Sequence, residues 1–141
     1  MMIDVREAAA GPELNVACAE AMGWKWAVTP PDYHGEHGGE KVLVPPGRTL
    51  SDFESVLPRV GPIGHIGVKD YSGNIAIAWE LVEALGRWWF KIEKLSEARP
   101  WQASFIARSG FSYWAEADTA PLAISQAFLL AHGITEIEIS E

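Results

Sequence analysis

The chain has 141 residues and a net charge of −8, from 19 acidic and 11 basic side chains. A chain of this length can bury a core without disulfides, and the single cysteine, Cys18, cannot form an internal one. The negative charge argues against non-specific nucleic-acid binding, which depends on lysine and arginine at phosphates. Because no basic, apolar leader opens the chain and no apolar run reaches ~18 residues, we expect a cytoplasmic protein that does not enter membranes.

Residues 1–10 show no clear helix or strand pattern, so we expect a short lead-in there and a single domain over residues 11–141. The first helix is predicted over residues 12–22, because proline suits a first turn and Gly23 follows the last apolar residue. Apolar residues at helical spacing predict that one face of this helix is buried. These residues are Leu14, Ala17, Cys18, Ala21 and Met22.

Two short strands are predicted on either side of a polar, glycine-rich turn. Residues 24–28 are rich in aromatic and β-branched side chains, and residues 41–44 are largely aliphatic. Residues 33–40 lie between them and are polar and rich in glycine, so the three segments together predict a hairpin. Residues 45–70 contain four prolines and are predicted to form a long ordered loop.

The second helix is predicted over residues 75–85, with Ser72 as the capping residue before it and Gly86 as the stop after it. Its apolar residues again recur at helical spacing and are expected to face the core. They are Ile75, Ala78, Trp79, Val82 and Leu85. Trp79, in the middle of this stripe, is predicted to be a core residue.

Three strands are predicted next, over residues 87–94, 101–107 and 111–117, because apolar residues alternate along each of them. The breaks between consecutive strands are short, which favours an antiparallel meander.

The last helix is predicted from the capping segment Asp118-Thr119, with Pro121 in the first turn, to His132. It is apolar nearly all round, so it must be covered on more than one side. Residues 135–140 alternate and predict a final edge strand. The predicted order is therefore α-β-β-α-β-β-β-α with a largely antiparallel sheet, followed by an edge strand.

Four segments of the sequence resemble the phage ABA sandwich domain family: residues 11–14 (GPEL), 22–24 (MGW), 71–80 (YSGNIAIAWE) and 117–124 (ADTAPLAI). The resemblance implies the α/β (α+β) fold class, as a compact layered α-β-α sandwich, in a protein of phage or prophage origin. It implies no catalytic residues and no cofactor. Residues 33–70 are longer and richer in proline than the family pattern, so this member's own function could lie there.

His34, Glu36, His37 and Glu40 lie close together in the sequence, and imidazole and carboxylate groups are ligands for zinc or nickel. A glycine-rich loop does not hold such ligands in place in advance. We therefore expect a solvated turn without a functional metal, with His34 and His37 as the alternative metal ligands.

Two further motifs have a simple structural interpretation. Residues 61–67 (GPIGHIG) lack the spacing of a dinucleotide-binding or P-loop motif and predict an irregular loop. Asp118 could act as a catalytic acid, but its position at the start of a helix favours a capping role.

Aromatic residues on the three predicted strands are the main candidates for binding. Alternation sends Trp89 and Trp114 to the face opposite Trp88 and Tyr113, where they could contact a planar ligand or a partner protein. Alternatively, helices on both faces of the sheet would bury both sets. Cationic groups near the same strands are candidate ligand contacts, and they are Arg87, Arg99 and Arg108.

Three functions are consistent with these features. The first is a phage or prophage accessory protein, not an enzyme, that binds a host protein, for example to counter a defence system. The second is a module that sequesters a small nucleotide-like signal. The third is a small hydrolase that uses His34, His37, His65 or Asp118.

The apolar last helix also predicts a homodimer. A single sheet covers only one side of a helix, so residues 121–132 are expected to form a two-fold contact between two chains. The alternative is that residues 45–70 of the same chain cover the outer side of the helix.

Overall fold

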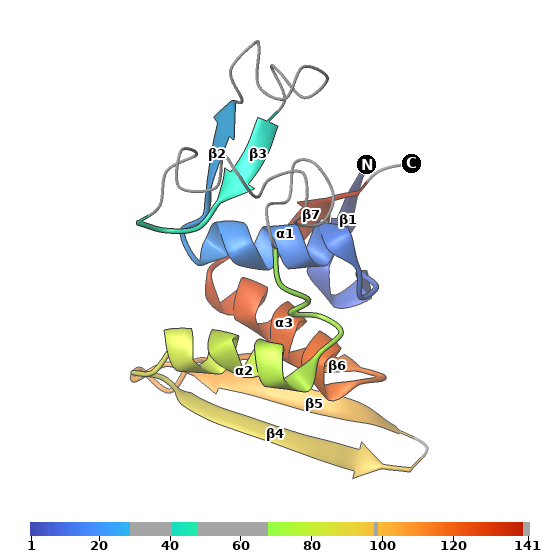
Figure 1. Ribbon diagram of the computed structural model, residues 1–141. Coiled ribbons are helices and arrows are strands. Elements are labelled where there is room, and N and C mark those ends of the chain that lie inside the picture. Colours follow the sequence, from blue (N-terminus) through green and yellow to red (C-terminus); the bar gives the residue numbers. More distant parts are fainter. Residues whose placement is uncertain (29–40, 48–67, 98, 140–141) are drawn as a thin grey trace. The chain divides into compact units, whose positions relative to one another are not determined.

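A computed structural model of the protein describes residues 1–28, 41–47, 68–97 and 99–139 (Figure 1). The chain forms two compact units. Unit 1 consists of Met1–Ala21 and Lys69–Glu141, and unit 2 consists of Met22–Val68, inserted between these two parts of unit 1.

Unit 1 is layered, with helices stacked on one side of a three-stranded sheet. In Figure 1 the sheet lies at the bottom, α2 and α3 lie above it, and α1 lies above α3. The helices are α1 (Pro12–Ala21), α2 (Ile75–Ala84) and α3 (Ala120–Ala131). The sheet consists of β4 (Trp89–Ser96), β5 (Arg99–Ile106) and β6 (Ser112–Ala117).

The three-stranded sheet is an antiparallel meander in the order β4-β5-β6, as predicted. Phe90 pairs with Phe105, and Phe105 pairs with Tyr113 on the other side. This row lies on the inner face, toward α3, where Ala103, Phe105 and Ala115 are fully buried. The residues predicted to face the core from the three strands therefore share this face, while Ser104 of the opposite face is buried as well.

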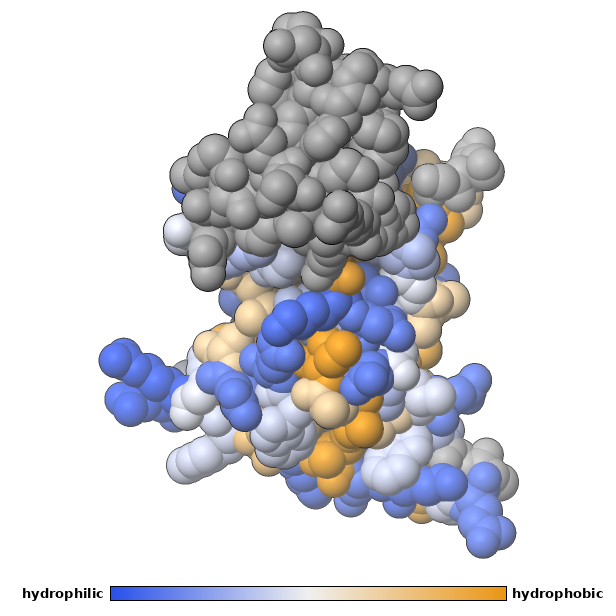
Figure 2. Space-filling view, viewed as in Figure 1, coloured by the Kyte–Doolittle hydropathy of each residue, from blue (hydrophilic) through white to orange (hydrophobic). Residues whose placement is uncertain are grey.

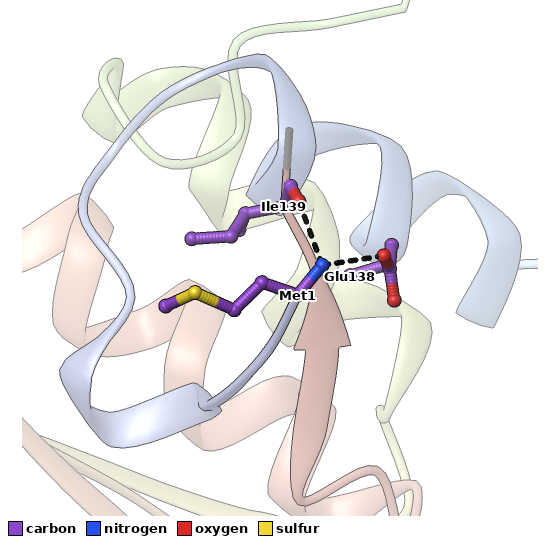
Figure 3. A network of polar contacts seen from close by, with 3 residues as sticks. All are labelled: Met1, Glu138 and Ile139. Carbon is purple, nitrogen blue, oxygen red and sulfur yellow. Dashed lines mark hydrogen bonds and ion pairs between the residues drawn. The ribbon is translucent and has the colours of Figure 1, made fainter. Parts of the chain in front are cut away.

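A second, two-stranded sheet joins the two ends of the chain. β1 (Met2–Asp4) pairs antiparallel with β7 (Glu136–Glu138). The amino group of Met1 lies 2.7 Å from Oε1 of Glu138 and donates to the carbonyl of Ile139 at 3.3 Å (Figure 3). The predicted final strand is confirmed, and its partner is a strand that the sequence did not predict.

Residues 1–10 contribute to the core of unit 1. The short 3-10 helix η1 (Val5–Glu7) follows β1, and Val5 and Ala8 are buried. The backbone N–H of Val5 donates to the carbonyl of Thr135 at 2.9 Å. The predicted lead-in is therefore an ordered part of the fold.

Helix α3 is the centre of unit 1, because eight consecutive residues, 123–130, are buried. The sheet contacts it through β5 and β6, and α1, α2 and η1 contact it on its other sides. Ser125 and Gln126 are buried too, and Nε2 of Gln126 donates to the carbonyl of Ala8 at 2.8 Å. The prediction that this helix is covered on more than one side is confirmed.

This burial overturns the reason for predicting a dimer through residues 121–132. The predicted exposed apolar strip does not exist, because α1 and α2 of the same chain cover it. Most of residues 45–70, the alternative cover, lie outside the described residues.

Helix α2 faces the core with a side that overlaps the predicted stripe only in part, since Ala78 of that stripe is buried. Ala78 and Leu81 are its buried residues, whereas Ile75 is 51% exposed and Trp79 is 45% exposed. The prediction that Trp79 is a core residue is wrong. α2 is apolar at most positions, so its periodicity does not select one face. The N-cap is Asn74 rather than Ser72, and its side chain accepts from the N–H of Ile77.

Helix α1 is tied to the segment before α2 by a buried polar network. Oδ1 of Asn15 accepts from the N–H of Ser72 at 2.9 Å and from its hydroxyl at 2.7 Å. Ser72 Oγ also accepts from the N–H of Gly11 at 3.0 Å, and Nδ2 of Asn15 donates to Asp70 at 3.1 Å. The network joins the two parts of unit 1 on either side of the insertion.

Unit 2 contains a short antiparallel pair, β2 (Lys25–Val28) with β3 (Lys41–Val44). Trp26 pairs with Leu43, which is buried, while Trp26 is 45% exposed. The two predicted strands and their pairing are confirmed, whereas the turn that was predicted over residues 33–40 lies outside the described residues.

The fold class is confirmed as mixed α+β with antiparallel sheets. All predicted helices and strands are present, with β1 and η1 in addition. The organisation of residues 11–141 as a single domain stays a prediction. Within the described ranges, no helix has the length and apolar content needed to span a bilayer.

Replacing Phe128 with alanine should destabilise the protein strongly. Phe128 is fully buried in α3 and packs against Phe105, with ring centroids 6.2 Å apart. Loss of such a side chain costs ~3–5 kcal/mol of unfolding free energy, measured by urea denaturation. Phe111→Ala is the matched control, because Phe111 is 62% exposed, and it should cost about 1 kcal/mol or less. Equal losses for the two variants would contradict the central role of α3.

Replacing Asn15 with alanine should also destabilise the protein. It would leave the buried N–H of Ser72 without its acceptor, which costs about 1–3 kcal/mol. The unfolding midpoint in urea measures this loss. An unchanged midpoint would show that Ser72 finds another acceptor.

Candidate functional site

The face of the three-stranded sheet opposite α3, here called the outer face, is the candidate functional surface. Strand alternation places every second side chain on it. Among the described residues no helix covers this face, since α2 and α3 both lie on the other side (Figure 1). Its three cross-strand rows are Trp89–Ile106–Ser112, Lys91–Ser104–Trp114 and Glu93–Gln102–Glu116.

Trp89 and Trp114 are the large aromatic side chains of the outer face. Trp89 is 72% exposed and Trp114 is 42% exposed, and Ile106 lies half-buried beside Trp89 in the same row. The two tryptophans are two strands and two residue steps apart, which corresponds to roughly 12 Å along the sheet. The described residues therefore do not bury both faces of the sheet, and the binding role of the two tryptophans stays a prediction.

Arg6 is a contact of this surface that sequence reasoning missed. Its guanidinium carbon lies 4.6 Å from the centroid of the Trp114 ring, within range of a cation–π interaction. Nε and Nη2 of Arg6 also donate to the Trp114 carbonyl at 3.1 and 2.9 Å. Arg6 lies in η1, more than a hundred residues before Trp114, so no local signal connects them.

The three predicted arginines do not form one site. Arg87 precedes β4 and Arg108 follows β5, so both lie at the Trp89 end of the sheet, and both are exposed. Arg99 pairs with Ser96 at the opposite end of β5. Only Arg87 and Arg108 are placed to act together with Trp89.

A family model described as the phage ABA sandwich domain matches residues 19–129. The chain belongs to this family. The match includes unit 2, α2, the three strands of the outer face and most of α3. No curated protein and no solved structure matches the chain. The outer face is therefore part of the phage ABA sandwich domain itself.

The residues proposed for catalysis or metal binding lie mostly outside the described part of the chain. His34, His37 and His65 lie outside the described residues, as do residues 61–67. Asp118 is exposed and lies directly before Thr119, the N-cap of α3. The Thr119 side chain accepts from the N–H of Leu122 at 3.4 Å. Within the described ranges, no three His, Cys, Asp or Glu side chains are grouped so as to hold a metal ion.

Two buried side chains of this phage ABA sandwich domain have raised pKa values. Burial raises the pKa of the Cys18 thiol to about 12. Burial is the larger cause and the charge of Glu80 is the next, and together they raise the pKa of Tyr71 to about 12. Both groups are therefore protonated near neutral pH, and Cys18 is a buried apolar residue rather than a nucleophile.

A cavity of about 300 Å³ opens near the start of α1. Its lining includes Ile3, Ala8, Leu14 and Ile137, together with the acidic residues Glu7 and Glu13, and no lysine or arginine among the residues that the structure describes. An anionic ligand would be repelled there, so the cavity does not suit the predicted nucleotide-like signal.

The raised pKa values predict a loss of stability at high pH. Above about pH 9 the unfolded state loses the Cys18 proton, whereas the folded state keeps it up to about pH 12, and Tyr71 adds to this above about pH 10. The unfolding free energy should therefore fall as the pH rises through this range. Urea denaturation at several pH values measures the slope, which should be shallower in Cys18→Ala. An identical slope in that variant would contradict the buried thiol.

Proposed function

We propose that this protein is a phage- or prophage-encoded accessory protein that acts in the host cytoplasm by binding a host protein, without catalysis. Countering a host defence system is the role that we propose for this binding. The observation that carries the proposal is the exposure of Trp89 and Trp114 on the outer face.

The composition of the outer face supports a protein partner. Tryptophan is enriched among the residues that dominate binding energy in protein interfaces. Here the two tryptophans and Ile106 are flanked by exposed polar side chains able to form hydrogen bonds, such as Lys91 and Ser112. An apolar centre with a polar rim is the usual anatomy of such interfaces.

The surroundings of Trp114 also favour a pre-organised contact. Arg6 stacks on the Trp114 ring and donates two hydrogen bonds to the Trp114 carbonyl. A side chain that is already held in place loses less entropy on binding, which strengthens the complex.

A second candidate function rests on Arg87 and Arg108. Two cationic side chains and the exposed Trp89 at one end of the sheet could bind a planar anion, with the ring stacking on a base and the arginines at phosphates. This arrangement favours the sequestration of a small nucleotide-like signal.

Co-purification from a host lysate tests the first proposal. Wild-type protein should retain a specific host protein, identified by mass spectrometry, and the purified partner should bind it stoichiometrically. Trp89→Ser with Trp114→Ser should weaken that binding by about 2 kcal/mol or more, roughly thirtyfold. Phe111→Ser is the matched control, because Phe111 is exposed and its ring packs against Tyr113 of the inner face, with ring centroids 4.9 Å apart, and it should bind as the wild type does.

Calorimetry with purified nucleotides separates the two candidates. A nucleotide that binds the wild-type protein and binds Arg87→Ala with Arg108→Ala much more weakly would support sequestration. Equal binding of the host partner to the wild-type protein and the double tryptophan variant would contradict the proposed surface.

A further inference from the structure

The outer edge of β4 is an open strand edge. β4 is eight residues long and pairs with β5 on one side, and no described strand pairs with its other side. An edge of this length exposes unpaired backbone N–H and C=O groups that can pair with a strand of another chain. Proteins commonly protect such edges, so an open one requires an explanation.

The opposite edge of the same sheet is treated differently. At β6, η1 contacts the strand and Arg6 donates two hydrogen bonds to the Trp114 carbonyl. Arg6 therefore bonds to the backbone of β6, whereas no described residue bonds in this way to the outer edge of β4.

We propose that the protein forms a two-fold dimer by antiparallel pairing of β4 with β4 of a second copy. The two three-stranded sheets then join into one continuous sheet of six strands. This proposal is independent of the partner proposed for the outer face, and it replaces the contact predicted through α3.

The sequence of β4 is complementary to itself in one register. A two-fold axis makes each pairing reciprocal, and an axis at Ile92 places Lys91 opposite Glu93 of the second copy. These side chains share the outer face, where Lys91 and Glu93 of one chain already lie 3.5 Å apart. The dimer would thus form an alternating cluster of four charges, in which each lysine faces a glutamate across the new strand pair.

The other pairs in this register are compatible as well. Trp89 lies opposite Leu95 on the outer face, and Phe90 lies opposite Lys94 on the inner face, where the lysine can lie over the ring. Moving the axis to Lys91 or to Glu93 would instead place like charges opposite each other. Of these three axis positions, the charges therefore favour Ile92, and this register pairs almost the whole length of β4.

The exposure of Trp79 fits the same contact. Trp79 packs edge-on against Phe90 of β4, with ring centroids 5.6 Å apart, yet 45% of it remains exposed. Ile75 lies one turn earlier on α2 and is 51% exposed. Apolar side chains gather over α2 and the sheet below it on the face drawn in Figure 2. A second copy at β4 would lie next to this apolar surface and reduce its contact with water.

Light scattering at micromolar concentration tests the proposal. We expect a mass near twice the 15.5 kDa of the monomer. A mass that stays at the monomer value up to the highest soluble concentration would overturn it.

Charge reversal tests the register. Lys91→Glu alone, and Glu93→Lys alone, place like charges across the axis, so each should weaken dimerisation about tenfold or more. The double variant K91E/E93K restores opposite charges and should dimerise like the wild type. A mixture of the two single variants should form heterodimers, because one copy then carries two acids and the other two bases.

Glu116→Lys is the matched control for these variants. It makes the same change in charge on the outer face of β6, two strands from the proposed axis, and should leave the dimer intact. Thermal unfolding should show that every variant is folded. A dimer that is equally stable in K91E, E93K and the double variant would overturn pairing through β4, whatever the outcome of the partner-binding test.

Discussion

The burial of α3 is the constraint on which the rest of unit 1 depends. A helix whose residues 123–130 are all buried needs neighbours on every side, and one sheet supplies only one of them. The protein meets this requirement with α1, α2 and η1, which come from three other places in the sequence. Because these elements gather around α3, none of them is left to cover the other face of the sheet. The exposed tryptophans of the outer face are thus a consequence of where the core lies.

The same requirement explains why residues far apart in the sequence are bonded to each other. α1 and α2 both contact α3, and buried hydrogen bonds join Asn15 of α1 to Ser72, which lies just before α2. Unit 2 is inserted between these segments, so the network closes unit 1 on either side of the insertion. Two of the segments that resemble the family, residues 11–14 and 71–80, meet in this network through the N–H of Gly11 and the hydroxyl of Ser72. The two segments are far apart in the sequence but in contact in the structure.

The outer face and the β4 edge offer two different kinds of contact. The outer face presents side chains, two of them large and aromatic, and suits a partner with its own apolar pocket. The edge presents backbone groups, which pair with any strand, and here the charges of Lys91 and Glu93 limit which strand fits. Pairing at the edge would leave the outer face open and place two copies of it side by side. The two proposals are therefore compatible, and one contact could strengthen the other through bivalent binding.

The sequence by itself determined the elements of unit 1 that have a strong local signal: the three helices, the antiparallel meander and the alternation that separates Trp88 from Trp89. Those signals depend on neighbours a few residues away, so they can be read without a structure. The sequence did not show which side of α2 is buried, because an almost wholly apolar helix has no preferred face, and Trp79 was consequently placed in the core. It also did not show β1 or the stacking of Arg6 on Trp114. Only the tertiary structure decided all three features. The buried side of α2 depends on its packing against α3. β1 and Arg6 each depend on a partner more than a hundred residues away, and a short strand or a single side chain carries no local trace of that partner.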